Sequence, residues 1–384
     1  MIYLTYNDQP TGVYFSQVTD VCNFVNRKFN ADIRLVALIS VRNFSANKKS
    51  IKQHFSGAIV LPMFPKQKNW KKNKLILKLL FLFIGKQSIW CRGVFAGNLA
   101  LNLKKRMGVK KIVFDGRGAY KAEYNEYLSK IVEGKNEIAE LENNVIHHSD
   151  CRIAVSEKLV EYWRNEYDYK MDSHVVIPCT LNNDVEFFFP SKEVIIEIRK
   201  ELGFDDKDIV FVYSGSSADW QSLVIVDDFI FMQMQMNATI KFMLLANTKL
   251  EHLKTYKQFP ERIIQKWVKA HEVGDYLSAA DYGIVIRENS ITNQVASPTK
   301  FAEYLNAGLS VLISENIGDF SSFTKQNNCG HIISDFSSDY NFTKLPYSEK
   351  VKNFNLAQKY FTKDVFSSGY ETILNVLKEE VSDD

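Results

Sequence analysis

Residues 280–287 (ADYGIVIR) and residues 297–313 (SPTKFAEYLNAGLSVLI) decide how this chain folds. Residues 283–286 form a short apolar run of the kind that a buried parallel strand requires. Residues 309–313 form a second such run, and Gly308 ends the segment before it in the way that glycine commonly ends a helix. The pattern therefore predicts two buried strands joined by a loop and a helix.

The start of the predicted helix carries residues that suggest a ligand. Ser297 is a good N-cap residue, and Pro298 suits the first helical position. A helix N-terminus offers free N–H groups and the positive end of the helix dipole, so it binds phosphate. Lys300 adds a mobile positive charge in the first turn, and Arg287, which ends the preceding strand, adds a forked set of donors.

A carboxylate lies one turn further along the same helix. Glu303 follows Thr299 by four residues, so both side chains share one helix face. This position suits hydrogen bonds from ribose hydroxyls below a bound diphosphate. A helix end whose Lys and Glu are merely solvated is the alternative. The site interpretation is favoured because strand, helix start, Lys, Glu and terminal Gly all agree with a nucleoside-diphosphate site at the carboxyl edge of a parallel sheet.

The block SPTKFAEYL, followed by AGL and Val311, resembles the nucleotide-sugar site of retaining GT-B glycosyltransferases of the family 4 type. It is most similar to members that build bacterial surface polysaccharides such as capsule and O-antigen. The resemblance implies that Lys300 contacts the donor diphosphate and Glu303 the ribose. It also implies that the backbone near Glu272 and Val273 pairs with the nucleotide base.

The length and the element order predict the domain organisation. A chain of 384 residues can hold two domains, and strands alternate with helices in both halves. We expect an α/β protein with an acceptor- and membrane-facing domain at residues 1–185 and a nucleotide-sugar-binding domain at 186–378, followed by a disordered tail at 379–384. The resemblance implies two Rossmann-like, doubly wound domains, a donor site in the cleft between them, and a final helix that crosses back to the first domain.

Composition narrows the possible classes of protein. Apolar residues make up 46% and charged residues 24% of the chain, as in a globular protein. The first residues resemble a strand rather than a signal peptide, and no apolar run is long enough for a membrane span. Five scattered cysteines without metal-ligand spacing predict reduced thiols in the cytoplasm and no metal site.

Charge is distributed unevenly along the chain. Residues 1–111 hold 20 Lys and Arg but only three acidic residues, a net charge of +17, so the rest must carry −14 to give the total of +3. This excess predicts that the first domain faces a polyanion or an anionic membrane. Nothing in the chain matches a nucleic-acid-binding motif.

Residues 66–86 combine lysines with a long apolar run, LILKLLFLFI. A helix of this composition suits a membrane interface, where Trp70, Lys71, Lys72 and Lys74 would meet anionic headgroups. The alternative is a core helix with a solvated, lysine-rich start.

Three places in the first domain suggest an acceptor side. Gly12 follows the first strand and would let backbone approach a ligand closely, although a plain turn glycine is nearly as good an interpretation. Arg92 ends a strand at residues 88–92 and is either a cleft or a surface residue. Asp115 and Arg117 belong to the sequence DGRG, which resembles an element of the same glycosyltransferases and suggests catalytic residues. An Asp–Arg pair that only fixes the loop is equally plausible.

The remaining donor-side candidates follow strands of the second domain. Gly215 and Ser216 lie in a Gly/Ser loop that suits a phosphate or sugar. Trp220 and Gln221 replace a basic pair that many members of the family carry, so Arg287 and Lys300 become the expected catalytic cations. Val295 stands where many relatives have a glutamate, which leaves Asn289, Asn293 or backbone groups to contact the sugar.

Three further segments are expectations about structure. Residues 42–52 are expected to be a loop, residues 122–148 one long helix, and residues 268–272 a short strand.

We expect a metal-independent transferase without a cofactor, peripheral on the inner face of the cell membrane, that moves sugar from a nucleotide sugar to a lipid-linked glycan. The resemblance implies retention of configuration. Two alternatives remain: a nucleotide-sugar epimerase of the same fold, and a non-enzymatic polybasic scaffold that binds membranes.

Overall fold

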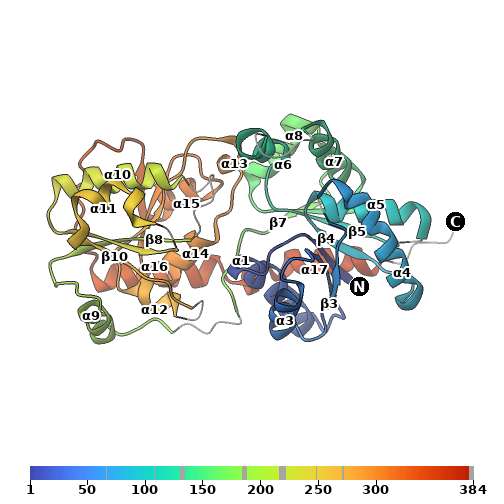
Figure 1. The fold of residues 1–384 in the computed structure, drawn as a ribbon, viewed down its shortest axis with the longest axis horizontal. Coiled ribbons are helices and arrows are strands. Elements are labelled where there is room, and N and C mark those ends of the chain that lie inside the picture. The colour runs from blue at the N-terminus through green and yellow to red at the C-terminus, as the bar shows by residue number, and fades with distance from the viewer. Residues whose placement is uncertain are drawn as a thin grey trace. The chain divides into compact units, whose positions relative to one another are not determined.

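A computed structural model describes residues 1–65, 67–107, 109–129, 135–183, 188–215, 222–247, 249–269 and 272–379. The chain divides into two compact units. The first unit comprises residues 1–184 and 363–384, and the second comprises residues 185–362. Each unit contains one parallel sheet with helices packed on it, as Figure 1 shows.

The sheet of the first unit has seven parallel strands in the order β3-β2-β1-β4-β5-β6-β7. From β1 the chain moves outward to β2 and β3, and then returns to place β4 on the other side of β1. The strands are β1 (Ile2–Tyr6), β2 (Arg34–Ile39), β3 (Ile59–Pro62), β4 (Ile89–Arg92), β5 (Ile112–Gly116), β6 (Cys151–Ala154) and β7 (His174–Val176). The point between β1 and β4 is therefore the topological switch point of this sheet.

Helices connect these strands, and the last two follow the second unit in the chain. They are α1 (Gly12–Tyr14), the π-helix η1 (Phe15–Thr19), α2 (Asp20–Phe29), α3 (Phe44–His54), the 3₁₀-helix η2 (Gln67–Asn73), α4 (Lys74–Ile84), α5 (Gly93–Met107), α6 (Tyr120–Glu123), the π-helix η3 (Tyr124–Leu128), α7 (Lys135–His148), α8 (Glu157–Tyr167), η7 (Lys363–Phe366) and α17 (Ser367–Lys378). Ser156 caps α8, because its hydroxyl accepts a hydrogen bond from the Leu159 N–H at 3.0 Å.

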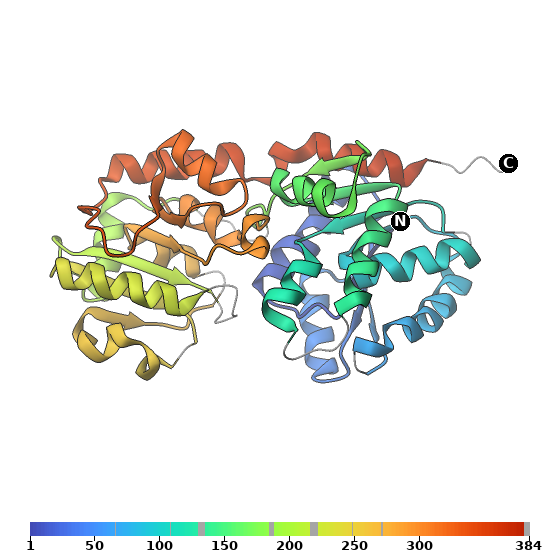
Figure 2. The ribbon, with the colours of Figure 1, turned by 90° about the horizontal axis from the view of Figure 1, so that it is seen from above.

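The C-terminal helix completes the core of the first unit. Tyr370, Ile373, Leu374 and Leu377 of α17 are buried at helical spacing and pack with Val18, Val21 and Trp90. Figure 1 and Figure 2 show α17, in red, among the blue and green elements of this unit. The return of the final helix agrees with the expectation for it, but residues 363–378 do not belong to the second domain as the proposed boundaries had it.

The sheet of the second unit has six parallel strands in the order β10-β9-β8-β11-β12-β13, with its switch point between β8 and β11. Its strands are β8 (Ile209–Ser214), β9 (Ile240–Leu245), β10 (Ile263–Gln265), β11 (Tyr282–Val285), β12 (Ser310–Ser314) and β13 (Gly330–Ile333). Its helices are α9 (Lys192–Glu201), α10 (Leu223–Met236), η5 (Leu250–His252), α11 (Lys254–Gln258), η6 (Pro260–Arg262), α12 (Val273–Ser278), α13 (Ile291–Gln294), α14 (Thr299–Asn306), α15 (Phe320–Asn327) and α16 (Tyr347–Tyr360). The prediction of two doubly wound α/β domains is confirmed.

The predicted strand, loop, helix and strand of the opening stretch are β11, α13 with its flanking loops, α14 and β12. Gly283 is required within β11, since a Cβ there would lie 2.4 Å from the ring of Tyr304. Gly308 ends α14 with a φ of 79°, where a Cβ would also meet Phe189. The helix starts one residue later than predicted, because Pro298 rather than Ser297 occupies the N-cap position.

Several expectations about elements were wrong. Residues 44–54 form α3 instead of a loop, and the described part of residues 268–272 contains no strand, because the pairing strand is β10 at Ile263–Gln265. The long helix expected at residues 122–148 is replaced by α6, η3 and α7, with residues 130–134 outside the described chain. Of the tail at 379–384, only Glu379 is described, and it accepts a hydrogen bond from Lys111 at 2.7 Å.

Candidate functional site

The predicted donor residues gather at the carboxyl edge of the second sheet. Gly215 follows β8 and Arg287 follows β11, so they flank the switch point where ligands bind in open α/β sheets. The φ of Gly215 is 144°, a conformation that favours glycine. Ser216, Trp220 and Gln221 lie outside the described residues.

Arg287 is held by the end of the neighbouring strand β12 and by helix α13, which follows it in the chain. Its backbone N–H donates to Ser314 Oγ at 2.8 Å, and that hydroxyl donates back to the Arg287 carbonyl at 2.8 Å. Arg287 Nη1 donates to Asn293 Oδ1 at 3.2 Å. Asn293 is fully buried and also donates to the Glu288 carbonyl at 3.2 Å. Asn293, a predicted donor-binding residue, thus positions the guanidinium in this structure.

Lys300 lies in the first turn of α14 and is 7% exposed. Its Nζ lies 4.0 Å from the centroid of the Tyr213 ring, which stabilises the cation through its π face. Burial, followed by the charge of Arg287, holds the pKa of Lys300 well below its usual value, although Glu303 opposes the shift. Two cationic side chains thus lie close enough to repel each other, and a bound anion would relieve that repulsion.

The rest of α14 presents the carboxylate and fixes the helix to the sheet. Glu303 is exposed to solvent, yet the surrounding protein atoms still raise the pKa of its carboxyl against the pull of Lys300. The Ser214 N–H donates to the Tyr304 hydroxyl at 2.9 Å, which ties the end of β8 to this helix. Ser297 and Thr299, at the helix start, are partly exposed.

Glu272 and Val273, the predicted base-pairing residues, lie at the start of α12 and are partly exposed. Glu272 accepts a hydrogen bond from the Lys269 N–H at 3.0 Å, which shapes the turn before the helix. Val295 is buried at 3% exposure, whereas Glu288 is exposed, so the exposed carboxylate of this loop lies at a different position from the one expected.

The predicted acceptor-side residues meet at the carboxyl edge of the first sheet. Asp115, at the end of β5, is 2% exposed and accepts a hydrogen bond from the Tyr3 hydroxyl at 2.6 Å. Arg117 Nη1 lies 3.3 Å from Asp115 Oδ1, and Arg92 Nη1 lies 3.5 Å from Asp115 Oδ2. The structure therefore brings together three of the predicted residues at one carboxylate.

Three neighbours of this cluster were not foreseen. Arg117 Nη2 donates to Gln17 Oε1 at 3.4 Å and to Cys179 Sγ at 3.0 Å. Asp8, in the loop after β1, lies 4.0 Å from Arg92 Nε, and its side chain is 34% exposed. Burial raises the pKa of Asp8 against the effect of Arg92. Its place after a central strand was the only signal in the sequence, and a turn aspartate gives the same signal.

Gly12 begins α1, and a Cβ there would find no atom within 4 Å. The structure of this unit therefore does not itself require glycine at the position. Gly116 differs, because a Cβ at the end of β5 would lie 2.6 Å from the ring of Trp163.

The segment expected at a membrane interface exposes different side chains from those predicted. Trp70 is only 2% exposed and donates to Glu137 Oε1 at 3.0 Å, so its assignment as a membrane residue was wrong. Lys71 and Lys72 are exposed, and Lys74 is partly exposed. The exposed apolar side chains instead belong to α4: Leu75, Leu79, Leu82 and Phe83, at 52%, 61%, 72% and 87%.

Among the described residues, no helix is both long and apolar enough to cross a bilayer. Within the same residues, no three His, Cys, Asp or Glu side chains are grouped so that they could hold a metal ion. All five cysteines are buried free thiols, as predicted.

No protein-family model matches this sequence, and no curated protein is significantly similar to it. Solved structures do resemble it. A sucrose-phosphate synthase from Thermosynechococcus elongatus is 13% identical with a TM-score of 0.72, and 98% of each chain is covered. The Anabaena protein Alr3699/HepE, solved with UDP and glucose, is 12% identical with a TM-score of 0.70, over 98% of this chain and 100% of that one.

WaaG, a glycosyltransferase of lipopolysaccharide biosynthesis, is 10% identical with a TM-score of 0.69, over 98% of this chain and all of its own. At identities this low, the similarity is evidence for the fold alone. The similar part of the chain extends over both units. The chain has the GT-B fold.

Proposed function

We propose that this protein is a glycosyltransferase that moves a sugar from a nucleoside-diphosphate sugar to a lipid-linked glycan in bacterial surface polysaccharide synthesis. One observation carries the proposal. Arg287 and the N-terminal turn of α14 with Lys300 converge at the switch point of the second sheet. A diphosphate is the anion that such an arrangement of two cations and a helix N-terminus suits best.

The similar structures support the donor class. HepE was solved with UDP and glucose, and a trehalose-6-phosphate protein from E. coli was solved with UDP-2-fluoro glucose. Glu303 lies one turn beyond Lys300 on an exposed face, where ribose hydroxyls can donate to its carboxylate. We therefore propose UDP or a related nucleoside diphosphate as the leaving group.

The proposed reaction forms a bond between the acceptor oxygen and the anomeric carbon of the sugar. The bond from that carbon to the diphosphate breaks, and the acceptor proton passes to the departing diphosphate. Arg287 and Lys300 stabilise the charge that develops on the diphosphate. The acceptor oxygen attacks the same face of the sugar from which the diphosphate departs, so the configuration at the anomeric carbon is retained. This part of the proposal rests on the resemblance of the SPTKFAEYL block.

The cluster around Asp115 is the proposed acceptor side. Asp8 keeps a partly exposed carboxylate beside Arg92, so it can accept a hydrogen bond from a sugar hydroxyl. Asp115 is more deeply buried and orients Arg92 and Arg117. We assign Asp115 to positioning and the partly exposed Asp8 to acceptor contact.

We propose that α4 holds the protein on the inner face of the cell membrane. Leu75, Leu79, Leu82 and Phe83 share one face of the helix, while Leu77 and Phe81 are buried on the other. Lys74 and Lys78 lie between the two faces, where their ammonium groups can reach lipid phosphates. Apolar side chains flanked by lysines, in a segment without acidic residues, fit an anionic bilayer interface.

The donor proposal is tested with a thermal-shift and calorimetric screen of UDP, GDP and their sugars. We expect one nucleotide to bind the wild-type protein, and Glu303→Ala to bind it at least several-fold more weakly without a change in melting temperature. An exposed glutamate of the same unit, Glu251→Ala, is the matched control. If no nucleoside diphosphate binds, the polybasic scaffold is the better interpretation.

The membrane proposal is tested by co-sedimentation with vesicles of phosphatidylglycerol and phosphatidylcholine. We expect Leu82→Ser with Phe83→Ser to lose most of the pelleted fraction, and Lys71, Lys72 and Lys74 changed to Glu to lose it as well. Phe188→Ser, at an apolar residue of the second unit that is 80% exposed, is the control. Unchanged pelleting of both sets of variants contradicts the assignment of α4.

A nucleotide-sugar epimerase of the same fold is the remaining enzymatic alternative. It would convert a nucleotide sugar without any acceptor, whereas the proposed transferase requires a polyprenyl-linked glycan for turnover. Product analysis with and without acceptor separates the two.

A further inference from the structure

A pocket of about 270 Å³ lies in the second unit, away from the proposed donor residues. Asp281 of its lining directly precedes β11, whereas Arg287 follows that strand, so the pocket and the donor residues lie at opposite edges of the sheet. Its walls come from α9, from the start of α16 and from the segment before it. They consist of Lys192, Ile195, Ile196, Arg199, Asp206, Asp281, Lys344, Leu345, Tyr347 and Lys350.

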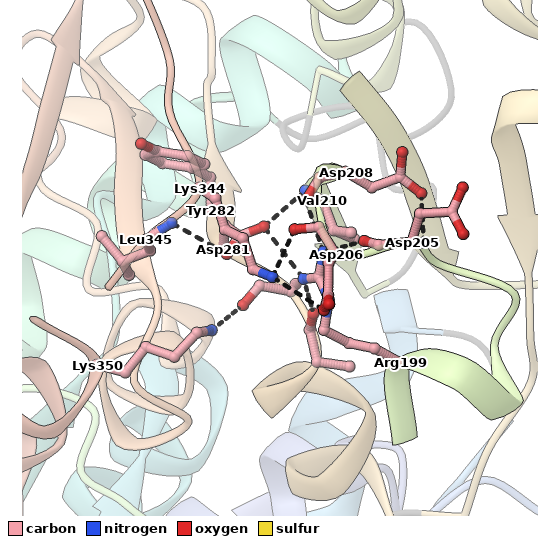
Figure 3. Close-up of polar contacts among 12 residues, drawn as sticks. Arg199, Asp205, Asp206, Asp208, Val210, Asp281, Tyr282, Lys344, Leu345 and Lys350 are labelled. Carbon is pink, nitrogen blue, oxygen red and sulfur yellow. Dashed lines mark hydrogen bonds and ion pairs between the residues drawn. The ribbon is translucent and has the colours of Figure 1, made fainter. Parts of the chain in front are cut away.

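The floor of the pocket is a buried charge cluster, shown in Figure 3. Arg199 Nη1 donates to the Ala279 carbonyl at 2.8 Å and lies 3.3 Å from Asp281 Oδ2. That oxygen also accepts from the Val210 N–H at 2.8 Å, and Asp281 Oδ1 accepts from the Leu345 N–H at 3.2 Å. The fold therefore uses the carboxylate of Asp281 fully, and this carboxylate is not available to a ligand.

Two cations of the cluster, Arg199 and Lys350, have N–H groups that donate no hydrogen bond within the described chain. Arg199 is 3% exposed, and its Nε has no hydrogen-bond partner within the described chain. Lys350 donates to the carbonyls of Ser278 and Ala280, which account for two of its three N–H groups among the described residues. Burial lowers the pKa of Lys350 to about 8 although Asp281 opposes the shift, and an anion beside it would restore its charge.

Two lysines stand at the mouth of the pocket. Lys192 is exposed, and Lys344 donates to the Asp206 carbonyl at 2.6 Å. The Asp206 carboxylate lies 3.6 Å from Lys344 Nζ but is 91% exposed, so this ion pair is weak and easily exchanged. Four cations and two carboxylates line the pocket, which gives it an excess of two positive charges.

The other walls are apolar. They leave room for an apolar group about the size of one ring. The residues of these walls are Ile195, Ile196, Leu345 and the ring of Tyr347. A phosphate monoester carries close to two negative charges at neutral pH, which matches the excess charge of the lining.

We propose that this pocket is a second small-molecule site, which binds a phosphate monoester on a compact apolar or ring-shaped body. The phosphate contacts Lys192, Lys344 and Lys350, and the body packs against Ile195 and Tyr347. The site is separate from the donor site, and its existence does not depend on the proposed transferase activity.

The test is a calorimetric titration of the full-length protein with phenyl phosphate, with inorganic phosphate and phenol as comparison probes. We expect saturable binding of phenyl phosphate, at least ten-fold tighter than binding of either comparison probe. The double variant Lys192→Gln/Lys344→Gln should weaken phenyl phosphate binding at least ten-fold. The double variant Lys200→Gln/Lys257→Gln removes the same charge from exposed lysines outside the pocket and should leave binding unchanged.

Two outcomes separate this site from the donor region. Arg287→Gln should leave phenyl phosphate binding intact, and saturating UDP should not displace phenyl phosphate. Displacement by UDP, loss in Arg287→Gln, or equal loss in both double variants overturns the proposal. Equal affinity for inorganic phosphate also overturns it, because the apolar walls would then contribute nothing. Absence of saturable binding assigns the cluster a purely structural role.

Discussion

The carboxyl edges of the two sheets carry similar residues with different electrostatic arrangements. In the first unit, Arg92 and Arg117 both face Asp115, and the Tyr3 hydroxyl completes the set of contacts. In the second unit, Arg287 is held by the amide of Asn293, and burial together with the positive charge of Arg287 lowers the pKa of Lys300. One cluster is compensated internally, and the other brings like charges together.

This difference shows that a switch point alone does not define a binding site. The topology places side chains at one edge, but the surrounding charges decide whether they serve the fold or a ligand. We expect the first cluster to matter mainly for stability and the second mainly for binding, and the following predictions test that division.

The largest effect is expected at Asp115. Asp115→Ala leaves Arg92 and Arg117 without their buried carboxylate, so the free energy of unfolding of the first unit should fall by about 3–5 kcal/mol. Urea unfolding measures this change in the free energy of unfolding. Asp32→Ala breaks an exposed pair with Arg34, whose side chains are 75% and 52% exposed, and should cost less than about 1 kcal/mol. Equal effects of the two changes would contradict a structural role for Asp115.

The opposite pattern is expected at Lys300. Lys300→Met removes a buried charge that the fold disfavours, so the free energy of unfolding should stay constant or rise. The affinity for UDP should fall by about 10- to 150-fold, the equivalent of one charged hydrogen bond of about 1.5–3 kcal/mol. Calorimetry with UDP and urea unfolding of the same variant provide both readings. A destabilised variant with unchanged UDP binding would reverse the proposed roles of the two clusters.

The sequence predicted the strands well because parallel strands are buried on both faces and appear as apolar runs. The segment of α3 gave no such signal, since Ile51 is its one fully buried hydrophobic residue and polar residues surround it. β10 was missed because its three residues, Ile263–Gln265, are too few to form a pattern.

The positions of the candidate residues were predictable only where a motif fixed their place in the fold. Lys300 and Arg287 lie where the sequence predicted because a strand end and a helix start define their places. Asp8 was missed because a single loop aspartate carries no pattern, and its contact with Arg92 joins two strands far apart in the sequence. Trp70 was misplaced because composition does not show which face of a segment is buried.

A smaller effect tests how closely each edge is packed. A Cβ on Gly283 would lie 2.4 Å from the Tyr304 ring, so Gly283→Ala should lower the free energy of unfolding of the second unit by about 1–3 kcal/mol. Gly12→Ala meets open space in the first unit and should change stability by less than about 0.5 kcal/mol. If Gly12→Ala nevertheless slows transfer at saturating donor, the open space above Gly12 belongs to the acceptor.

The smallest expected effect is the uptake of a proton by the protein when the nucleotide binds. The pKa of Lys300 is held well below its usual value in the free protein, and a bound diphosphate should raise it again. Between these two values the complex holds more protons than the free protein, so UDP affinity should increase as the pH falls through that window.

Calorimetry in two buffers of different ionisation enthalpy detects this proton as a difference in apparent binding enthalpy. Above pH 7 the terminal phosphate of UDP is already ionised, since its second pKa is about 6, so the proton is taken up by the protein. We expect uptake of up to one proton per UDP in the wild type, none in Lys300→Met, and unchanged uptake in Lys352→Met, a control at a lysine that is 42% exposed. Persistent uptake in Lys300→Met would assign the titrating group to another residue and remove the electrostatic contrast between the two sheet edges.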